Sequence, residues 1–177
     1  MSKEKQLEII GDELDSLMQR VIANHLRAGQ KASGWTMQSI RKQISDTGGV
    51  LFGRAYFGSL ETGRKPGPVP RGFRFVILKW MKDKGISASP VPYIRKPSTR
   101  WKPKYTPQER GDLSLAGAIA YRIRKEGTNL FRNGGRDDIY SNEIPKTVEN
   151  ILDRIMTVFA KDVESININS INEEGSD

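Results

Sequence analysis

The chain has 177 residues, of which 36% are hydrophobic and 28% charged, and its formal net charge is +8 at pH 7. That length is typical of one domain, and the apolar content is sufficient for a folded core. Because the chain has no cysteine and a single histidine, His25, a disulfide framework, a thiolate metal site and a histidine-rich metal centre are excluded.

The first predicted element is an amphipathic helix over residues 5–28, which ends at Gly29. Its apolar residues recur every three or four positions and form one stripe: Leu7, Ile10, Leu14, Leu17, Met18, Val21, Ile22 and Leu26. His25 lies beside this stripe, and we expect a helix-surface or interface residue there rather than a ligand. The start of the chain mixes charged and apolar residues, which does not predict a secretory signal.

Two strands are predicted next, over residues 35–44 and 50–60. The segment Asp46-Thr47-Gly48-Gly49 between them is a turn signal, so a β-hairpin is the simplest interpretation. The first strand is the weaker prediction, because Met37, Ile40 and Ile44 also fit a helical stripe. Three prolines within residues 66–70 then predict a stiff, extended connector.

Helices are predicted over residues 71–84, 113–125 and about 145–163. Asp112 is the expected cap of the second of these helices, and Pro145 suits the first turn of the third. The inward-facing residues expected for the first are Phe73, Val76, Ile77, Trp80 and Met81; for the second, Leu115, Ala116, Ile119, Ala120 and Ile123; and for the third, Val148, Ile151, Leu152, Ile155, Phe159 and Val163.

We therefore predict an α+β fold, in which a small antiparallel, hairpin-based β-sheet packs against three to four helices. One domain is expected over residues 1–166, with a long extended basic arm inserted at 87–111. A polar, acidic and flexible tail is expected at 167–177. The arm holds five prolines, and a loop of that length in a compact domain is usually functional or disordered.

Positive charge is concentrated in the middle of the chain. Residues 64–110 contain thirteen basic and two acidic side chains, a formal charge of +11. Aromatic residues interleave with the cations of the arm, and aromatic residues and arginine are enriched at the centres of interfaces. We therefore predict that the arm binds a partner through Tyr93, Arg95, Lys96, Arg100, Trp101, Lys102, Lys104 and Tyr105.

Catalytic and cofactor motifs are absent from the sequence. The glycine pairs Gly48-Gly49 and Gly134-Gly135 match neither a phosphate-binding loop nor a dinucleotide fingerprint. The adjacent carboxylates Asp137 and Asp138 have no accompanying cluster and are interpreted as part of an ordinary turn. We predict no enzyme activity, no cofactor and no metal site.

The sequence YFGSLETGRKPGP at residues 56–68 resembles the tail-completion or neck (head–tail connector) proteins of tailed bacteriophages. Matching features follow the same order along the chain: the N-terminal helix, the strand at Ser39-Ile40, WMKDKGI at 80–86, AIAYRIRKEGT at 118–128 and the terminal amphipathic helix. The resemblance covers about residues 5–165. The arm departs from it, being longer and more basic than the pattern requires.

This resemblance implies an α+β subunit of a virion ring, six- or twelve-fold, assembled in the bacterial cytoplasm. Such a ring joins the portal or its adaptor to the tail proteins, and DNA passes through its channel with non-specific contacts at most. It has no cofactor and no membrane partner. Arg64, Lys65, Arg71 and Arg74 would form a second contact or face the channel.

The sequence leaves a second interpretation open, a basic nucleic-acid-binding protein that acts through residues 64–110. Cations of this segment would neutralise phosphates, and Tyr93, Trp101 and Tyr105 would stack on single-stranded bases. No known DNA- or RNA-reading module is present. Charge alone does not separate this interpretation from an arm that binds acidic protein.

Overall fold

The structure is a computed structural model that describes residues 1–94 and 102–174, with side chains as far as residue 166. The chain divides into two compact units. Unit 1 comprises Met1–Gln30, Trp35–Phe57 and Asp137–Asp177, and unit 2 comprises Lys31–Gly34 and Gly58–Arg136. The single domain expected over residues 1–166 stays a prediction, and the two units are described separately.

Unit 1 is built on two long helices, α1 (Lys3–Arg27) and α7 (Glu143–Glu174). The predicted N-terminal helix is confirmed, and it ends before Gly29, whose φ of 65° is a left-handed conformation that favours glycine. Helix α7 begins two residues before Pro145, as expected for proline in a first turn. It continues to Glu174, beyond the predicted end near 163 and into the predicted tail.

The predicted hairpin is confirmed, with shorter strands. Strand β1 (Arg41–Ser45) pairs antiparallel with β2 (Gly48–Phe52), and Arg41 lies opposite Phe52. The expectation that residues 35–44 are all strand is wrong, because Trp35–Gln38 form the short helix α2 after Gly34, whose φ is 83°.

The second predicted strand, residues 50–60, is also wrong beyond Phe52. Gly53 follows the strand directly, and Ser59–Thr62 form the short helix α3 in unit 2. The aromatic residues that favoured a strand there contact other parts of unit 1 instead: the Phe57 ring lies 5.5 Å from the Tyr140 ring.

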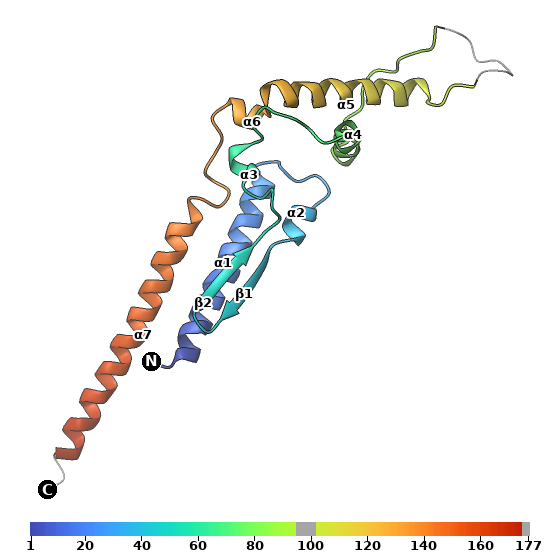
Figure 1. Cartoon of the computed structure of the whole chain (residues 1–177). Helices are drawn as coiled ribbons and strands as arrows, with labels where there is room; N and C mark the ends of the chain where they lie inside the picture. The colour runs from blue at the N-terminus through green and yellow to red at the C-terminus, as the bar shows by residue number, and fades with distance from the viewer. Residues whose placement is uncertain (95–101, 175–177) are drawn as a thin grey trace. The chain divides into compact units, whose positions relative to one another are not determined.

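Helix α1 contacts the hairpin on one side and α7 on another, as Figure 1 shows. A small residue brings the hairpin close to α1: a Cβ at Gly49 would lie 2.5 Å from Leu14 Cδ1. The buried apolar residues of unit 1 are Ile9, Leu14, Leu17, Val21 and Ile139. Four of these five lie on α1, so this helix forms the centre of the unit.

Unit 2 contains α4 (Phe73–Asp83), α5 (Pro107–Glu126) and α6 (Asn129–Arg132). Its core is small: Ile77 and Met81 of α4 pack against Ala116 and Ala120 of α5. Figure 1 views α4 nearly along its axis while α5 runs across the page, so the two helices cross. The small alanines allow the close approach of the crossing helices.

Helix α5 begins earlier than predicted, at Pro107 rather than residue 113. Thr106 and Glu109 form a capping box, in which the Thr106 side chain accepts from the Glu109 amide and the Glu109 carboxylate accepts from the Thr106 amide. The last five residues of the predicted arm, 107–111, are therefore helical and not extended. The expected cap, Asp112, lies inside the helix.

Two residues predicted to face inward from α4 do not. Val76 is 60% exposed and Trp80 is 38% exposed, whereas Ile77 and Met81 are buried as expected. The same error affects α7, where Val148, Leu152, Phe159 and Val163 are exposed. Both helices have apolar residues on more than one face, and only one face of each meets its own unit.

The described chain is thus mostly helical with one two-stranded antiparallel hairpin, an α+β fold with a minor sheet. No helix among the described residues is both long and apolar enough to cross a membrane.

Candidate interaction surfaces

Two of the stretches on which the sequence resemblance rests, within residues 56–68 and 118–128, come together in unit 2. The segment after α3 runs beside the turn from α5 to α6, and backbone groups join them. The Thr128 amide donates to the Arg64 carbonyl at 2.9 Å, and the Thr128 hydroxyl accepts from the Arg64 amide at 2.9 Å. The Gly67 amide donates to the Arg124 carbonyl, also at 2.9 Å. We call this arrangement the backbone clasp.

Two glycines make the backbone clasp possible. Gly63 has φ 68° and ψ −174°, and Gly127 has φ 79° and ψ −176°. This region of backbone space is essentially restricted to glycine. A Cβ at Gly63 would lie 2.5 Å from the Phe131 amide nitrogen, and one at Gly127 would lie 2.6 Å from the Arg64 carbonyl oxygen. The glycines of both motifs therefore serve the architecture of unit 2.

The first leg of the arm is fixed to the N-terminal half of α5. The Asp112 carboxylate accepts from the Ala88 amide at 2.8 Å and from the Ser87 hydroxyl at 3.2 Å. The Gln108 side-chain amide donates to the Ala88 carbonyl at 2.7 Å. The hydrogen bond from Ala88 is the main reason why the pKa of Asp112 lies below its usual value of 3.8. Gly111 completes the contact, because a Cβ there would lie 2.2 Å from the Ser89 carbonyl oxygen.

Tyr93 joins the two legs of the arm. Its hydroxyl donates to the Tyr105 carbonyl at 2.8 Å, and the Arg110 guanidinium lies 4.0 Å from the centre of its ring. The Val91 amide also donates to the Pro107 carbonyl at 2.8 Å. The arm is therefore a loop closed at its base, and Tyr93 has a structural role that the sequence did not indicate.

The predicted partner-binding residues have different positions. Lys102 and Lys104 are exposed, with the Lys104 ammonium 5.4 Å from the centre of the half-buried Tyr105 ring. The remaining four, Arg95, Lys96, Arg100 and Trp101, lie outside the described residues. Binding by the arm stays a prediction.

The second predicted contact set belongs to the connector and to α4. The Arg64 guanidinium donates to the Pro68 carbonyl at 2.6 Å and lies 5.8 Å from the Phe73 ring centre. This half-buried residue therefore stabilises the connector at residues 66–70. Lys65, Arg71 and Arg74 are exposed. The Arg74 guanidinium lies 4.8 Å from the centre of the Phe75 ring.

The two units carry opposite formal charges. Unit 1 contains 10 basic and 16 acidic side chains, a formal charge of −6. Unit 2 contains 19 basic and 5 acidic side chains, a formal charge of +14. The excess of cations noted in the sequence therefore extends over the whole of unit 2, including Arg122, Arg124 and Lys125 on α5.

An exposed apolar stripe runs along α7, and we call it the α7 outer face. Its members, between 41% and 67% exposed, are Ile144, Val148, Leu152, Met156, Phe159, Val163 and Ile166. They recur at intervals of three and four residues, which places them on one side of the helix. The exposed acids Glu149, Asp153 and Glu164 lie along one edge of this stripe.

Helix α4 presents a smaller exposed surface, the α4 outer face. It comprises Phe75, Val76 and Trp80, which are 38% to 60% exposed, together with the exposed cations Arg74, Lys79 and Lys82. The face is apolar with three exposed cations and one exposed acid, Asp83, around it, whereas the α7 outer face is apolar with an acidic edge. Sequence reasoning assigned part of both faces to the core, so it missed both surfaces. The residues concerned are Val76 and Trp80 of α4 and Val148, Leu152, Phe159 and Val163 of α7.

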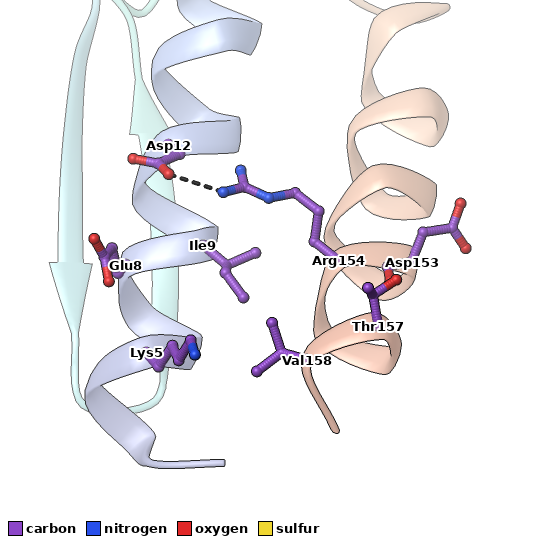
Figure 2. Close-up of a pocket in the computed structure, with 8 residues that line it drawn as sticks. All are labelled: Lys5, Glu8, Ile9, Asp12, Asp153, Arg154, Thr157 and Val158. Atoms are coloured by element: carbon purple, nitrogen blue, oxygen red, sulfur yellow. Dashed lines mark hydrogen bonds and ion pairs between the residues drawn. The ribbon is translucent and has the colours of Figure 1, made fainter. Parts of the chain in front are cut away.

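A groove of about 420 Å³ lies between α1 and α7 in unit 1, as Figure 2 shows. Ile9 and Val158 face each other across it, and the Arg154 side chain reaches from α7 to Asp12 on α1 at 3.0 Å. A second Arg154 nitrogen lies 3.0 Å from Glu13, and these hydrogen bonds to Asp12 and Glu13 raise the pKa of Arg154. The polar groups of the groove thus hold the two helices together.

The histidine and the adjacent aspartates that the sequence singled out do not form a catalytic or metal-binding cluster among the described residues. His25 is buried, and its Nδ1 lies 3.0 Å from the Gln30 side-chain oxygen, so of the two expected positions the helix surface is wrong and an interface stays a prediction. Asp137 and Asp138 are exposed in the turn-rich segment before α7. Within the described residues there is no cluster of three or more histidine, cysteine or acidic side chains placed to hold a metal ion.

Comparisons with protein-family models, with curated proteins and with solved structures find no match to this chain.

Proposed function

We propose that this chain is a structural subunit of the neck or tail of a tailed bacteriophage, where copies form a ring that joins the portal to the tail around the DNA channel. The observation that carries the proposal is the excess of exposed apolar surface. Among the described residues, twenty large hydrophobic side chains are exposed while nine apolar side chains are buried. Contiguous exposed apolar patches mark interaction sites, and a ring subunit buries them against its neighbours.

The phage setting comes from the resemblance in sequence, and the backbone clasp gives two glycines of the resembling stretches a structural role. The LETG stretch at residues 60–63 and the EGT stretch at 126–128 both belong to that resemblance. They lie in contact here, and their glycines hold a conformation that other residues rarely adopt. A shared pattern of this kind is expected where two proteins share an architecture, because the glycines are required by the backbone path.

The proposed role is mechanical and involves no covalent step. A formal charge of +14 on unit 2 suits contact with a polyanion, either DNA passing through the channel or an acidic neighbouring protein. The exposed cations Lys65, Arg71, Lys102 and Lys104 are the described candidates for these contacts.

The decisive experiment removes the gene from a phage that encodes this chain and supplies it in trans. We expect particles made without the protein to contain packaged heads without attached tails, and the protein to be detected at the neck of complete particles by antibody labelling in electron micrographs. Complete, infectious particles that lack this chain would overturn the proposal.

A free nucleic-acid-binding protein is the alternative, favoured by the charge of unit 2. It predicts binding to DNA or RNA that weakens steeply with salt, with a log–log slope of roughly −0.9 for each phosphate neutralised. Replacing Arg95, Lys96, Arg100, Lys102 and Lys104 by glutamine would abolish this binding. The matched control replaces five exposed cations of unit 1: Lys3, Lys5, Arg27, Arg41 and Lys161. Equal binding by both variants would exclude the arm as the nucleic-acid site.

A further inference from the structure

We propose that copies of this chain associate head to tail, with the α4 outer face of one copy seated on the α7 outer face of the next. This inference rests on the proposed function in that it names the contact between neighbouring subunits of the ring. It is argued from the two faces themselves and from the charges of the units that present them.

The α7 outer face has the composition of a helix-docking surface. Its seven apolar residues extend from Ile144 to Ile166, and the side of α7 that contacts α1 is a different one, marked by Thr147 and Arg154. Leaving this stripe in water exposes a larger apolar patch than single surface hydrophobics would. A partner that covers it must be apolar along its centre.

The charges beside the stripe select a basic partner. Glu149, Asp153 and Glu164 are exposed along its edge. Two cations of α7 are already engaged within unit 1: Lys146 pairs with Glu143 at 3.1 Å, and Arg154 pairs with Asp12 and Glu13. A second α7 would place acids beside acids, so pairing of α7 with itself is disfavoured.

The α4 outer face meets both requirements. Phe75, Val76 and Trp80 supply exposed apolar and aromatic surface, and aromatic residues are the usual anchors of an interface. Arg74, Lys79 and Lys82 supply positive charge around them, which exceeds the single negative charge of the exposed Asp83. The face belongs to the unit with a formal charge of +14, while α7 belongs to the unit with −6.

Pairing between two unlike faces is heterologous, so each copy keeps one free face of each kind after its first contact. Such contacts propagate from copy to copy, and they close into a ring when the rotation between neighbours allows it. A two-fold dimer through α7 alone would stop at two copies. The proposed contact is therefore of the kind from which rings are built, and it uses surfaces within a single chain.

Charge reversal tests the pairing. We expect the purified chain to sediment as an oligomer at tens of micromolar, and Glu149→Lys with Asp153→Lys, or Lys79→Glu with Lys82→Glu, to weaken association at least tenfold. Mixing the two double variants in equal amounts will restore the oligomer, because every contact then regains a basic and an acidic partner. The control, Asp46→Lys with Asp137→Lys, makes the same charge change at exposed positions away from the α7 outer face and will sediment as the parent does.

Apolar substitutions provide an independent measurement. Leu152→Ser with Phe159→Ser removes two exposed side chains of the α7 outer face, and we expect a monomer whose circular dichroism and urea unfolding match those of the parent. The control is Leu26→Ser, a change at another exposed leucine of unit 1. A variant that unfolds is replaced by Met156→Gln, which retains the length of the side chain.

The outcomes separate this inference from the proposed function. A parent chain that is monomeric at 100 µM, or an oligomer that neither charge reversal nor apolar substitution affects, overturns the head-to-tail contact. The contact is also overturned if the mixture of reversed variants stays monomeric. Absence of the chain from complete particles would instead overturn the virion role while leaving the contact intact.

Discussion

In unit 1, the long helices α1 and α7 contact each other through side chains, both apolar and charged, whereas unit 2 depends on a core of four buried residues and on hydrogen bonds between irregular backbone segments. Unit 1 is acidic and leaves a long apolar stripe uncovered. Unit 2 is basic and contains the glycines that the backbone requires. The chain therefore combines two modes of stabilisation, and each unit should be destabilised most by a different kind of substitution.

The largest expected effect lies in the backbone clasp. Gly127→Ala places a Cβ 2.6 Å from the Arg64 carbonyl oxygen and forces a residue with a side chain into a glycine-only conformation. We expect a loss of about 3 kcal/mol or more in the free energy of unfolding of unit 2, measured by urea denaturation.

The control for this change is Gly117→Ala. Gly117 lies inside α5, and a Cβ there meets no atom within 4 Å. Alanine should therefore stabilise the helix by about 0.5–1 kcal/mol. Equal destabilisation by both substitutions would show that unit 2 does not depend on the clasp.

The corresponding weak point of unit 1 is the charged contact between α1 and α7. Arg154→Ala leaves the nearly buried Glu13 carboxylate with the Asn150 amide, 3.4 Å away, as its remaining contact within the described residues. We expect a loss of about 1–3 kcal/mol in the unfolding free energy, because a desolvated charge loses its partner. Lys161→Ala, at an exposed position of the same helix, should change this free energy by less than about 0.5 kcal/mol.

A smaller effect is expected at the base of the arm. Tyr93→Phe removes the hydroxyl that donates to the Tyr105 carbonyl, at a cost of about 0.5–1.5 kcal/mol. Hydrogen exchange should become faster in residues 86–94 while the backbone clasp is unaffected. Tyr121→Phe, at a position that is 66% exposed, is the matched control. Equally fast exchange of residues 86–94 in this control variant would contradict the role given to Tyr93.

The smallest expected effect is a pH dependence of the contact between Asp112 of α5 and the first leg of the arm. Hydrogen bonds from Ala88, Gln108 and Ser87 lower the pKa of Asp112 from 3.8, so the carboxylate stabilises the folded arm base at pH values above 3.8. This stabilisation is lost as the pH falls through the lowered pKa. The chemical shift of the Ala88 amide proton should follow this titration, and Asp112→Asn should abolish the step.

Local sequence signals predicted the elements with clear boundaries. The periodicity of residues 5–28 gave α1, and the turn at Asp46-Thr47 gave the hairpin. The start of α5 was readable too, since Thr106, Pro107 and Glu109 form a helix-start signature. It was obscured by the prolines before it, which favoured an extended arm through residue 111.

Other features depend on contacts that periodicity does not reveal. The apolar residues of α4 and α7 lie on more than one face of each helix. The apolar periodicity therefore did not show that Val76 and Phe159 are exposed to water. The tyrosines and cations of residues 87–111 indicated a binding arm, but the bond from Tyr93 that closes its base joins the two legs of the loop. The backbone clasp likewise joins segments far apart in the sequence.

The Arg136 amide donates to the Glu61 carbonyl at 2.9 Å, which has a consequence for the modular construction of the protein. The stretch 58–136, which makes up unit 2 together with Lys31–Gly34, therefore begins and ends at adjacent points. Adjacent ends are typical of segments that tolerate circular permutation, so a chain opened at an exposed loop of this stretch should still form the backbone clasp.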